Sequence, residues 1–329
     1  MRSRGLVTSL ASIVMALTAT TALANEVVLK AVTGVPGPSP VAKVFLEYVE
    51  RVNERGAGVI KIDYIGGPEA TPASRQGVAL TRGIIDILYA PSSFYAGSMK
   101  EVDALLAVNR PMSELRTNGA FELLDERYGE QMNAYMFGWF DSTVNFNLYT
   151  TKEPKVVDGK LRLDGMRMFT TPTYRDLQRA VGADPVAVDV GEIMTALERG
   201  VIDGFAWPNY GLAALGFGRE AEYRIEPTFY SGNTPALINK DKWESLPEEA
   251  RKIMTEVAIE WEADVVDYLA KAKEAESNEL VEGGMKIYQL EGEAADAYIE
   301  VANSTLRARL ENAAGDTGKR LWDLLHKSE

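Results

Sequence analysis

The sequence predicts an α/β protein with two lobes, each a small mixed sheet flanked by helices, and a long C-terminal helix that links the lobes. Two observations carry this prediction. Residues 163–206 alternate short apolar segments with amphipathic helical patterns in the order β-α-β-α-β, and residues 27–90 repeat that order. Such alternation is typical of parallel strands joined by crossover helices. The 329 residues are enough for roughly two domains.

The elements of the first stretch are separated by turns rich in glycine and proline. Its first helical pattern places Val41, Phe45 and Tyr48 on one apolar face, which is the spacing of an amphipathic helix. We expect strands at 27–32, 59–65 and 84–90, and helices at 41–54 and 72–81.

The second stretch has the same organisation, and Gly182 and Gly200 follow its two helices. We expect strands at 163–169, 185–188 and 201–206, and helices at 174–181 and 192–199.

Two extended patterns are long enough to pass between the lobes. Residues 135–149 follow a helix expected at 111–128, and residues 223–238 form the natural return crossing. From Asp241 the chain turns helical. We expect an unusually long helix at 248–282, a strand at 285–289, and a helix at 291–325 with a break at Gly315.

The first 24 residues have the features of a secretory leader. Arg2 and Arg4 precede an apolar run at 6–17, and Ala22-Leu23-Ala24 is a small-x-small cleavage site. The run is too short for a membrane span of about 20 residues, although a retained N-terminal anchor is the alternative. We therefore expect residues 1–24 to be a cleaved signal peptide and the mature chain to begin near Asn25 in the periplasm.

Composition excludes several kinds of site. There is no cysteine, and the one histidine, His326, lies three residues from the end, which argues against thiol chemistry, disulfides, histidine metal sites and Ser-His-Asp triads. Removing the two arginines of the leader takes the net charge from −13 to −15. Such an acidic chain argues against nucleic acids and anionic membranes as partners.

Candidate site residues follow from the strand order. In open α/β sheets, ligands bind at the carboxyl ends of the strands. The segments that follow two of the expected strands, 169–173 and 205–210, are therefore site candidates.

Ordered motifs give a more specific hypothesis. They are the leader, Ile65-Gly-Gly-Pro-Glu69, Leu80-x-x-Gly-x-x-Asp86, the run from Gly182 to Pro208, and Asn239-Lys-Asp-Lys-Trp-Glu-Ser-Leu-Pro247. In this order, over essentially the whole mature chain, they resemble the periplasmic solute-binding proteins of TRAP (tripartite ATP-independent periplasmic) transporters, the family that includes dicarboxylate and sialic-acid binders.

The resemblance implies a two-lobed periplasmic binding protein that closes on a ligand and delivers it to a membrane permease. It implies lobe I at 25–144 with about 236–275, lobe II at 145–235 with about 276–329, and a ligand cleft between them. The ligand is typically a small organic acid held by an arginine that ends a Gly-Leu-Lys-Ile-Arg motif. Here the corresponding segment begins at Gly165 and ends at Phe169, which cannot pair with a carboxylate.

Three hypotheses account for this departure. In the first, Arg167, about 6.6 Å from position 169 on the same face of the strand, binds the carboxylate. The alternative is that Arg167 is a solvated strand residue. Arg175 reaches back from the following helix, the alternative being an ion pair with Asp176 or Asp184. In the third hypothesis Phe169 lines an apolar or aromatic box, the alternative being core packing.

Other ligand contacts are implied around this position. The family often places an asparagine or tryptophan that touches ligand where this chain has Trp207, and Asn145 and Asn147 share one face of the crossing strand. Glu69 and Tyr89 would form the opposite wall. The alternatives are core packing for Trp207 and ordinary edge polarity for the two asparagines.

The main functional hypothesis is therefore a non-catalytic receptor of a TRAP permease that closes on a small organic acid or a related polar metabolite. The alternatives are a receptor subunit for a signalling protein and an exported hydrolase or lyase that uses acidic residues such as Glu69, Asp86 or Asp203. No nucleophile elbow or acidic cluster with metal-ligand spacing is present, so we expect no enzyme, cofactor or metal. The alternative that the resemblance implies is a bound cation that bridges the ligand, as in some relatives that bind keto acids. We expect a monomer, with a dimer through the long C-terminal helix as the alternative.

Overall fold

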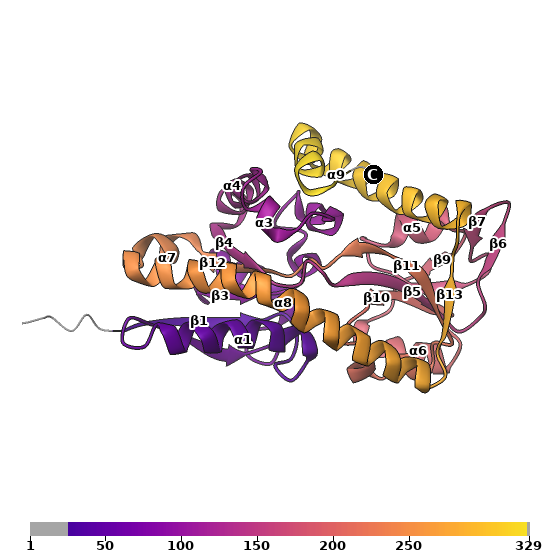
Figure 1. Cartoon of the computed structure of the whole chain (residues 1–329), viewed down its shortest axis with the longest axis horizontal. Helices are drawn as coiled ribbons and strands as arrows, with labels where there is room; N and C mark the ends of the chain where they lie inside the picture. The colour runs from indigo at the N-terminus through magenta and orange to yellow at the C-terminus, as the bar shows by residue number, and fades with distance from the viewer. Residues whose placement is uncertain (1–25, 328–329) are drawn as a thin grey trace, which may run out of the picture.

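The computed structural model describes residues 26–327, apart from the side chain of Phe217. It confirms the predicted two-lobed α/β architecture, because an elongated molecule carries one large sheet in each half (Figure 1). The predicted signal peptide, residues 1–24, lies outside the described residues. Within residues 26–327, no helix is long and apolar enough to cross a bilayer.

The first sheet has the strand order β2-β1-β3-β12-β4. Strands β1, β2 and β3 are parallel, and β12 is antiparallel to both of its neighbours. The strands are β1 (Val27–Thr33), β2 (Ile60–Gly66), β3 (Ile87–Tyr89), β4 (Ala134–Trp139) and β12 (Pro235–Asn239).

Helices cover both faces of this sheet. The first begins at Ser39, whose side chain accepts a hydrogen bond from the amide of Ala42, and has Pro40 in its first turn. The helix expected at 111–128 is divided at Gly119, whose φ of 94° favours glycine. The helices are α1 (Pro40–Arg55), α2 (Ala73–Thr81), α3 (Met112–Leu115), α4 (Ala120–Met132) and α7 (Lys240–Ser245), with short 3-10 helices η1 (Ser92–Tyr95) and η2 (Val102–Ala107).

The second sheet has the order β13-β11-β5-β10-β8-β9. Strands β8, β9 and β10 are parallel, whereas β5 is antiparallel to β10 and β11. The strands are β5 (Asn145–Thr150), β8 (Arg167–Phe169), β9 (Asp184–Val186), β10 (Gly204–Pro208), β11 (Tyr223–Ser231) and β13 (Lys286–Gln289).

The second lobe also has short helices and a hairpin that the sequence pattern did not predict. The hairpin pairs β6 (Lys155–Val157) with β7 (Lys160–Arg162). The helices are α5 (Arg175–Ala180) and α6 (Ile193–Glu198), with 3-10 helices η3 (Val190–Glu192), η4 (Ala213–Leu215) and η5 (Phe217–Arg219).

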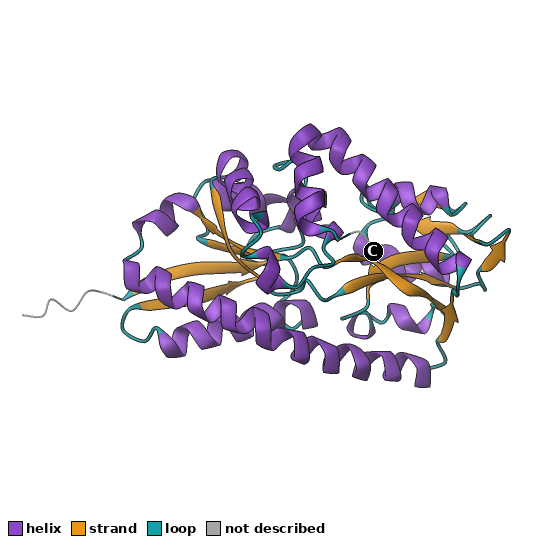
Figure 2. Cartoon of the chain, turned by 45° about the horizontal axis from the view of Figure 1, so that its top comes forward, coloured by secondary structure: helices purple, strands orange, loops and turns teal. Residues whose placement is uncertain are grey.

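Two long helices near the C-terminus match their expected bounds closely. Helix α8 (Glu248–Glu282) runs alongside both groups of strands (Figure 2). Helix α9 (Glu293–Leu325) contains the expected break at Gly315, where φ is 55° and ψ is −129°. The predicted long helix that links the lobes is thus confirmed.

The prediction of continuous strands between the lobes was wrong. The stretch 135–149 is divided into β4 and β5, and 223–238 into β11 and β12. Each crossing is a short segment without strand structure, 140–144 and 232–234. The physical reason is that each chain segment leaves one sheet and enters another, so the hydrogen-bond ladder must end between them.

Buried polar contacts hold the two crossings together. The carboxylate of Asp141 in the first crossing accepts hydrogen bonds from the amide of Thr234 in the second, at 3.0 and 3.1 Å. It also accepts one from Nε1 of Trp139 at 3.0 Å. A side chain at Gly232 would place its Cβ 2.1 Å from the carbonyl oxygen of Asp141, so only glycine fits there. Burial raises the pKa of Asp141, against the lowering effect of these donors.

We predict that Asp141→Ala lowers the free energy of unfolding by about 2 kcal/mol, because two buried N–H donors lose their acceptor. Urea unfolding at pH 7 measures this change. Asp63→Ala on β2, where the carboxylate is exposed, is the matched control, with an expected change within about 0.5 kcal/mol. Equal effects of the two substitutions would contradict the importance of the crossing.

Candidate functional site

The carboxyl ends of the parallel strands in both sheets face the junction between the lobes. Strand β4 is parallel to β3 and ends at Trp139, where the first crossing begins. Strand β5 starts at Asn145 beyond that crossing, and Pro208 at the end of β10 is in register with its second residue. Strand β8 runs parallel to β10 and ends at Phe169. The topology therefore brings the expected site segments to the junction.

Phe169 is part of the hydrophobic core of the second lobe. Its side chain is 2% exposed and belongs to a cluster with Ile193 and Leu197 of α6. It is in register with Phe205 on β10. Placed in this way the ring packs against other side chains, which is the core-packing alternative, and the arrangement gives no support to a contact with ligand.

Arg167 lies at the opposite end of β8 and is engaged with Asp203. Its Nε lies 3.0 Å from Oδ2 of Asp203, and its Nη2 donates to the carbonyl of Gly200 at 2.6 Å. Lys152 binds the same carboxylate at 2.7 Å. Burial alone would raise the pKa of Asp203, but hydrogen bonds from Lys152 and Arg167 lower it to about 2. Both arginine and aspartate therefore have structural partners.

Arg175 is the first residue of α5 and is partly buried. Among the residues that the structure describes, no side chain forms a hydrogen bond or ion pair with it; Asp176 lies instead 3.8 Å from Arg309. Four residues earlier, at the end of β8, the hydroxyl oxygen of Thr171 is buried without a described hydrogen-bond partner. A cation and a hydroxyl group without partners among residues 26–327 thus lie at the turn from β8 into α5.

Trp207, Asn147 and Asn145 lie together where β10 and β5 meet. Trp207 is partly buried and in register with Asn147, whose Nδ2 donates to the carbonyl of Ile225 at 2.8 Å. The Oδ1 of Asn147 is buried with no hydrogen-bond partner among the described residues. The backbone of Asn145 exchanges hydrogen bonds with Asn209, accepting from its amide at 2.7 Å and donating to its side chain at 3.1 Å.

Glu69 and Tyr89 of the first lobe have different environments. Glu69 is exposed, and the hydrogen bond from the amide of Gly67 lowers the pKa of its carboxylate. Tyr89 is fully buried, with ring centroids 5.1 Å from Phe45 and 6.2 Å from Phe140. Burial raises the pKa of its hydroxyl. Among the described residues, no hydrogen bond joins these two side chains.

A cavity of about 840 Å³ reaches the start of β5 at the junction. It is bounded by the end of η2, strand β11 and helix α9, and Asn145 is the one predicted site residue that lines it. Within residues 26–327, no group of three or more histidine, aspartate or glutamate side chains is placed to hold a metal ion.

Sequence patterns missed two residues at the junction, Asp141 and Glu276, and included Tyr210 only as the end of the candidate segment 205–210. Asp141 holds the crossings, Tyr210 is buried in the core of the first lobe, and Glu276 binds the backbone after β10. Neither Asp141 nor Glu276 follows an expected strand of the α/β pattern, so position gave no signal for them.

Comparisons with known proteins agree over most of the chain. A family model described as "Bacterial extracellular solute-binding protein, family 7" matches residues 32–312. A monocarboxylate 2-oxoacid-binding periplasmic protein of Nostoc sp. is 23% identical over 285 residues, covering 81% of this chain and 74% of the relative. An ectoine/5-hydroxyectoine-binding periplasmic protein of Ruegeria pomeroyi is 25% identical over 171 residues, about half of each chain.

Solved structures share the fold. A TRAP periplasmic solute-binding protein from Desulfovibrio salexigens with bound orotic acid aligns with a TM-score of 0.78 and 19% identity, covering 91% of this chain and 97% of that one. A Bordetella pertussis extracytoplasmic solute receptor that binds pyroglutamic acid aligns with a TM-score of 0.75 and 17% identity, covering 91% and 99%.

We predict that Arg167→Gln lowers the free energy of unfolding by about 1–2 kcal/mol at pH 7, because Asp203 loses a charged donor. The pKa of Asp203 is lowered in the folded state, so this contribution is present above the unfolded pKa and is lost as pH falls from about 5 towards about 2. Urea unfolding at both ends of that range tests it. Arg175→Gln is the matched comparison and should change stability by less than about 0.5 kcal/mol; the reverse order would contradict the assignment.

Proposed function

The chain belongs to the bacterial extracellular solute-binding proteins of family 7, and on this basis we propose that it is the receptor subunit of a TRAP permease. It captures a small organic acid in the periplasm and releases it to the membrane subunits without chemical change. The proteins of known ligand to which it is similar include binders of 2-oxoacids, orotic acid and pyroglutamic acid, all of which carry a carboxyl group.

Arg175 is the single observation that carries the proposal of an acidic ligand. A partly buried guanidinium with no described acid partner is costly to desolvate unless an anion pairs with it. Its planar fork matches a carboxylate in bidentate geometry. The buried hydroxyl of Thr171 at the same turn offers a further donor. In our proposal this pair replaces the arginine that the resemblance leads one to expect at Phe169.

Trp207 and the two asparagines complete the proposed site. An indole at the end of β10 can cover the flat or apolar part of a small acid, and the amides of Asn145 and Asn147 can bind its polar substituents. Glu69 remains a proposed contact from the opposite lobe. Arg167 and Phe169 have structural partners, so we propose no contact between either of them and the ligand.

Hinge closure is the proposed mechanism. The acid binds to the β8–α5 turn first, and rotation about the two crossings then brings the first lobe over it and excludes water. Desolvation strengthens the ion pair with Arg175, so the closed state is favoured only when ligand is present. We propose that lobe I comprises 25–144 with about 236–275, that lobe II comprises 145–235 with about 276–329, and that the receptor acts as a monomer.

Two other functions start from the same fold. A receptor that passes its ligand-bound state to a signalling protein would use the same site, and co-purification with membrane subunits separates the two cases. An exported hydrolase or lyase would need a reactive group at the junction. Asp203 is held by Lys152 and Arg167, so the site offers the hydrolase hypothesis little support.

We predict that the purified protein gains thermal stability with at least one small carboxylic acid and does not convert it. Ligand at a hundred times its Kd stabilises the folded state by about 2.7 kcal/mol. A thermal-shift screen of mono- and dicarboxylic acids measures the gain, and the methyl ester of each active acid is the control. A screen in which esters and acids stabilise equally would contradict the carboxylate site.

We predict that Arg175→Gln weakens binding of that acid by about 10- to 100-fold, the worth of a charged hydrogen-bonded pair. Isothermal titration calorimetry measures the affinity. Arg179→Gln, which removes an exposed charge from the same helix, is the control and should change affinity less than about twofold. Equal losses from both substitutions would mean that overall charge, and not the position of Arg175, determines affinity.

A further inference from the structure

Tyr210, which follows β10 in the second lobe, is buried in the hydrophobic core of the first. Its side chain is 7% exposed and belongs to a cluster with Tyr89, Phe140 and Trp261. Burial, the neighbouring hydroxyl of Tyr268 and the Glu276 carboxylate raise the pKa of Tyr210. A side chain carried by one lobe thus completes the packing of the other.

The backbone on either side of Tyr210 is tightly held. The two carboxylate oxygens of Glu276 on α8 accept hydrogen bonds from the amides of Gly211, at 2.7 Å, and Ala213, at 2.9 Å. Asn209 exchanges two hydrogen bonds with Asn145. Gly211 has a φ of 87°, which turns the chain between these anchors. The loop therefore presents Tyr210 to the first lobe in one orientation.

The distribution of core residues shows why this contact matters. On the side of α9, one hydrophobic cluster continues from the first lobe into the second, from Leu124 to Leu148 and Tyr298. On the side of α8 and α6, the hydrophobic core of the first lobe is separate from that of the second. Among the described residues, Tyr210 is the buried second-lobe side chain that belongs to the first-lobe core. A change of angle between the lobes on that side must move or withdraw this ring.

We propose that Tyr210, oriented by Glu276, is a clasp that sets the angle between the lobes and positions Trp207 at their junction. Trp207 lies only three residues before Tyr210, so a ligand that displaces the indole also shifts the backbone that carries Tyr210. Tyr210 and Glu276 are positioning residues, and neither needs to touch the ligand. The inference rests on the proposed function only in assuming that the lobes move.

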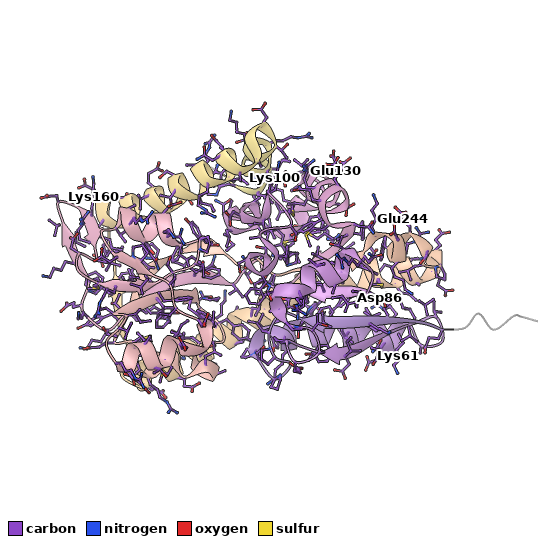
Figure 3. The ribbon with its side chains drawn as sticks, turned by 180° about the vertical axis from the view of Figure 1, so that it is seen from behind. Lys61, Asp86, Lys100, Glu130, Lys160 and Glu244 are labelled. Carbon is purple, nitrogen blue, oxygen red and sulfur yellow. The ribbon has the colours of Figure 1, made fainter. Side chains whose placement is uncertain are left out.

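Distance measurements on the unliganded protein test the clasp. The chain has no cysteine, so Lys61→Cys on β2 and Lys160→Cys on β7 allow two spin labels at exposed sites on opposite lobes (Figure 3). Pulsed electron–electron double resonance then gives the distribution of distances between the lobes. We expect Tyr210→Ala to shift the mean distance between the labels by more than about 2 Å, or to widen the distance distribution by more than about 2 Å. Tyr210→Phe keeps the ring and should leave the distribution unchanged.

Glu276→Gln tests the orientation of the loop. Hydrogen exchange at Gly211 and Ala213 should accelerate about tenfold, because the charged acceptor is lost, and the distance distribution should change in the direction of Tyr210→Ala. Glu279→Gln, an exposed carboxylate one turn along α8, is the control and should alter neither measurement. Faster hydrogen exchange with an unchanged distance distribution would mean that Glu276 stabilises only the loop backbone. That result would overturn its proposed role in setting the angle between the lobes.

An unchanged distribution in folded Tyr210→Ala would overturn the proposal as a whole, as would equal effects of the Ala and Phe substitutions. If Tyr210→Ala does not fold, Tyr210→Leu takes its place with the same expectation. Because no ligand is added, failure here leaves the binding proposal standing, and failure of the carboxylic acid screen leaves the clasp standing.

Discussion

The structure depends most on the buried carboxylate of Asp141, because it joins the two non-helical crossings between the lobes. Each crossing leaves a sheet and so loses its regular hydrogen-bond partners, yet the second crossing is buried throughout and the first is buried at 140, 141 and 144. Asp141 supplies the missing acceptor to the amide of Thr234, and the absence of a side chain at Gly232 lets the segments approach. The cost of burying the carboxylate is offset by three N–H···O contacts. The strand ends that form the proposed site meet because of this junction.

In the proposed site, local charge matters more for an acidic ligand than the net charge of the whole chain. The net charge of −13 would repel an anion at long range, but at physiological salt such repulsion is screened beyond about 8 Å. Within that distance, the turn from β8 into α5 presents Arg175 without a described acid partner, whereas Arg167 is already paired. Two arginines eight residues apart in sequence therefore have different environments, and this difference is the basis of the role that we propose for Arg175.

Sequence patterns predicted the architecture because hydrophobic periodicity, and glycines at the ends of elements, are local signals. Gly182, Gly200 and Gly315 marked the ends or the break of helices where the structure has them, and the alternating segments gave both sheets. The strand bounds were less accurate: β8 has three residues where seven were expected. Short strands take their length from neighbours in the sheet, which a local pattern does not contain.

The candidate site was harder to predict, because the contacts that distinguish its candidate residues join positions far apart in sequence. The bond between Arg167 and Asp203 spans 36 positions, and the one between Gly211 and Glu276 spans 65. No hydrophobic period indicates that Arg167 has a partner, or that Arg175 has none in the part of the chain that the structure describes. Likewise, the motif located Phe169, but the packing of α6 and β10 determines that its ring is buried.

A crystal structure of the protein with the carboxylic acid that stabilises it most would test the central claim directly. The account predicts that the carboxylate lies within hydrogen-bonding distance of the guanidinium of Arg175 and the hydroxyl of Thr171, with Trp207 over the rest of the molecule. An acid bound in the cavity between β11 and α9, with Arg175 still unpaired, would contradict the account.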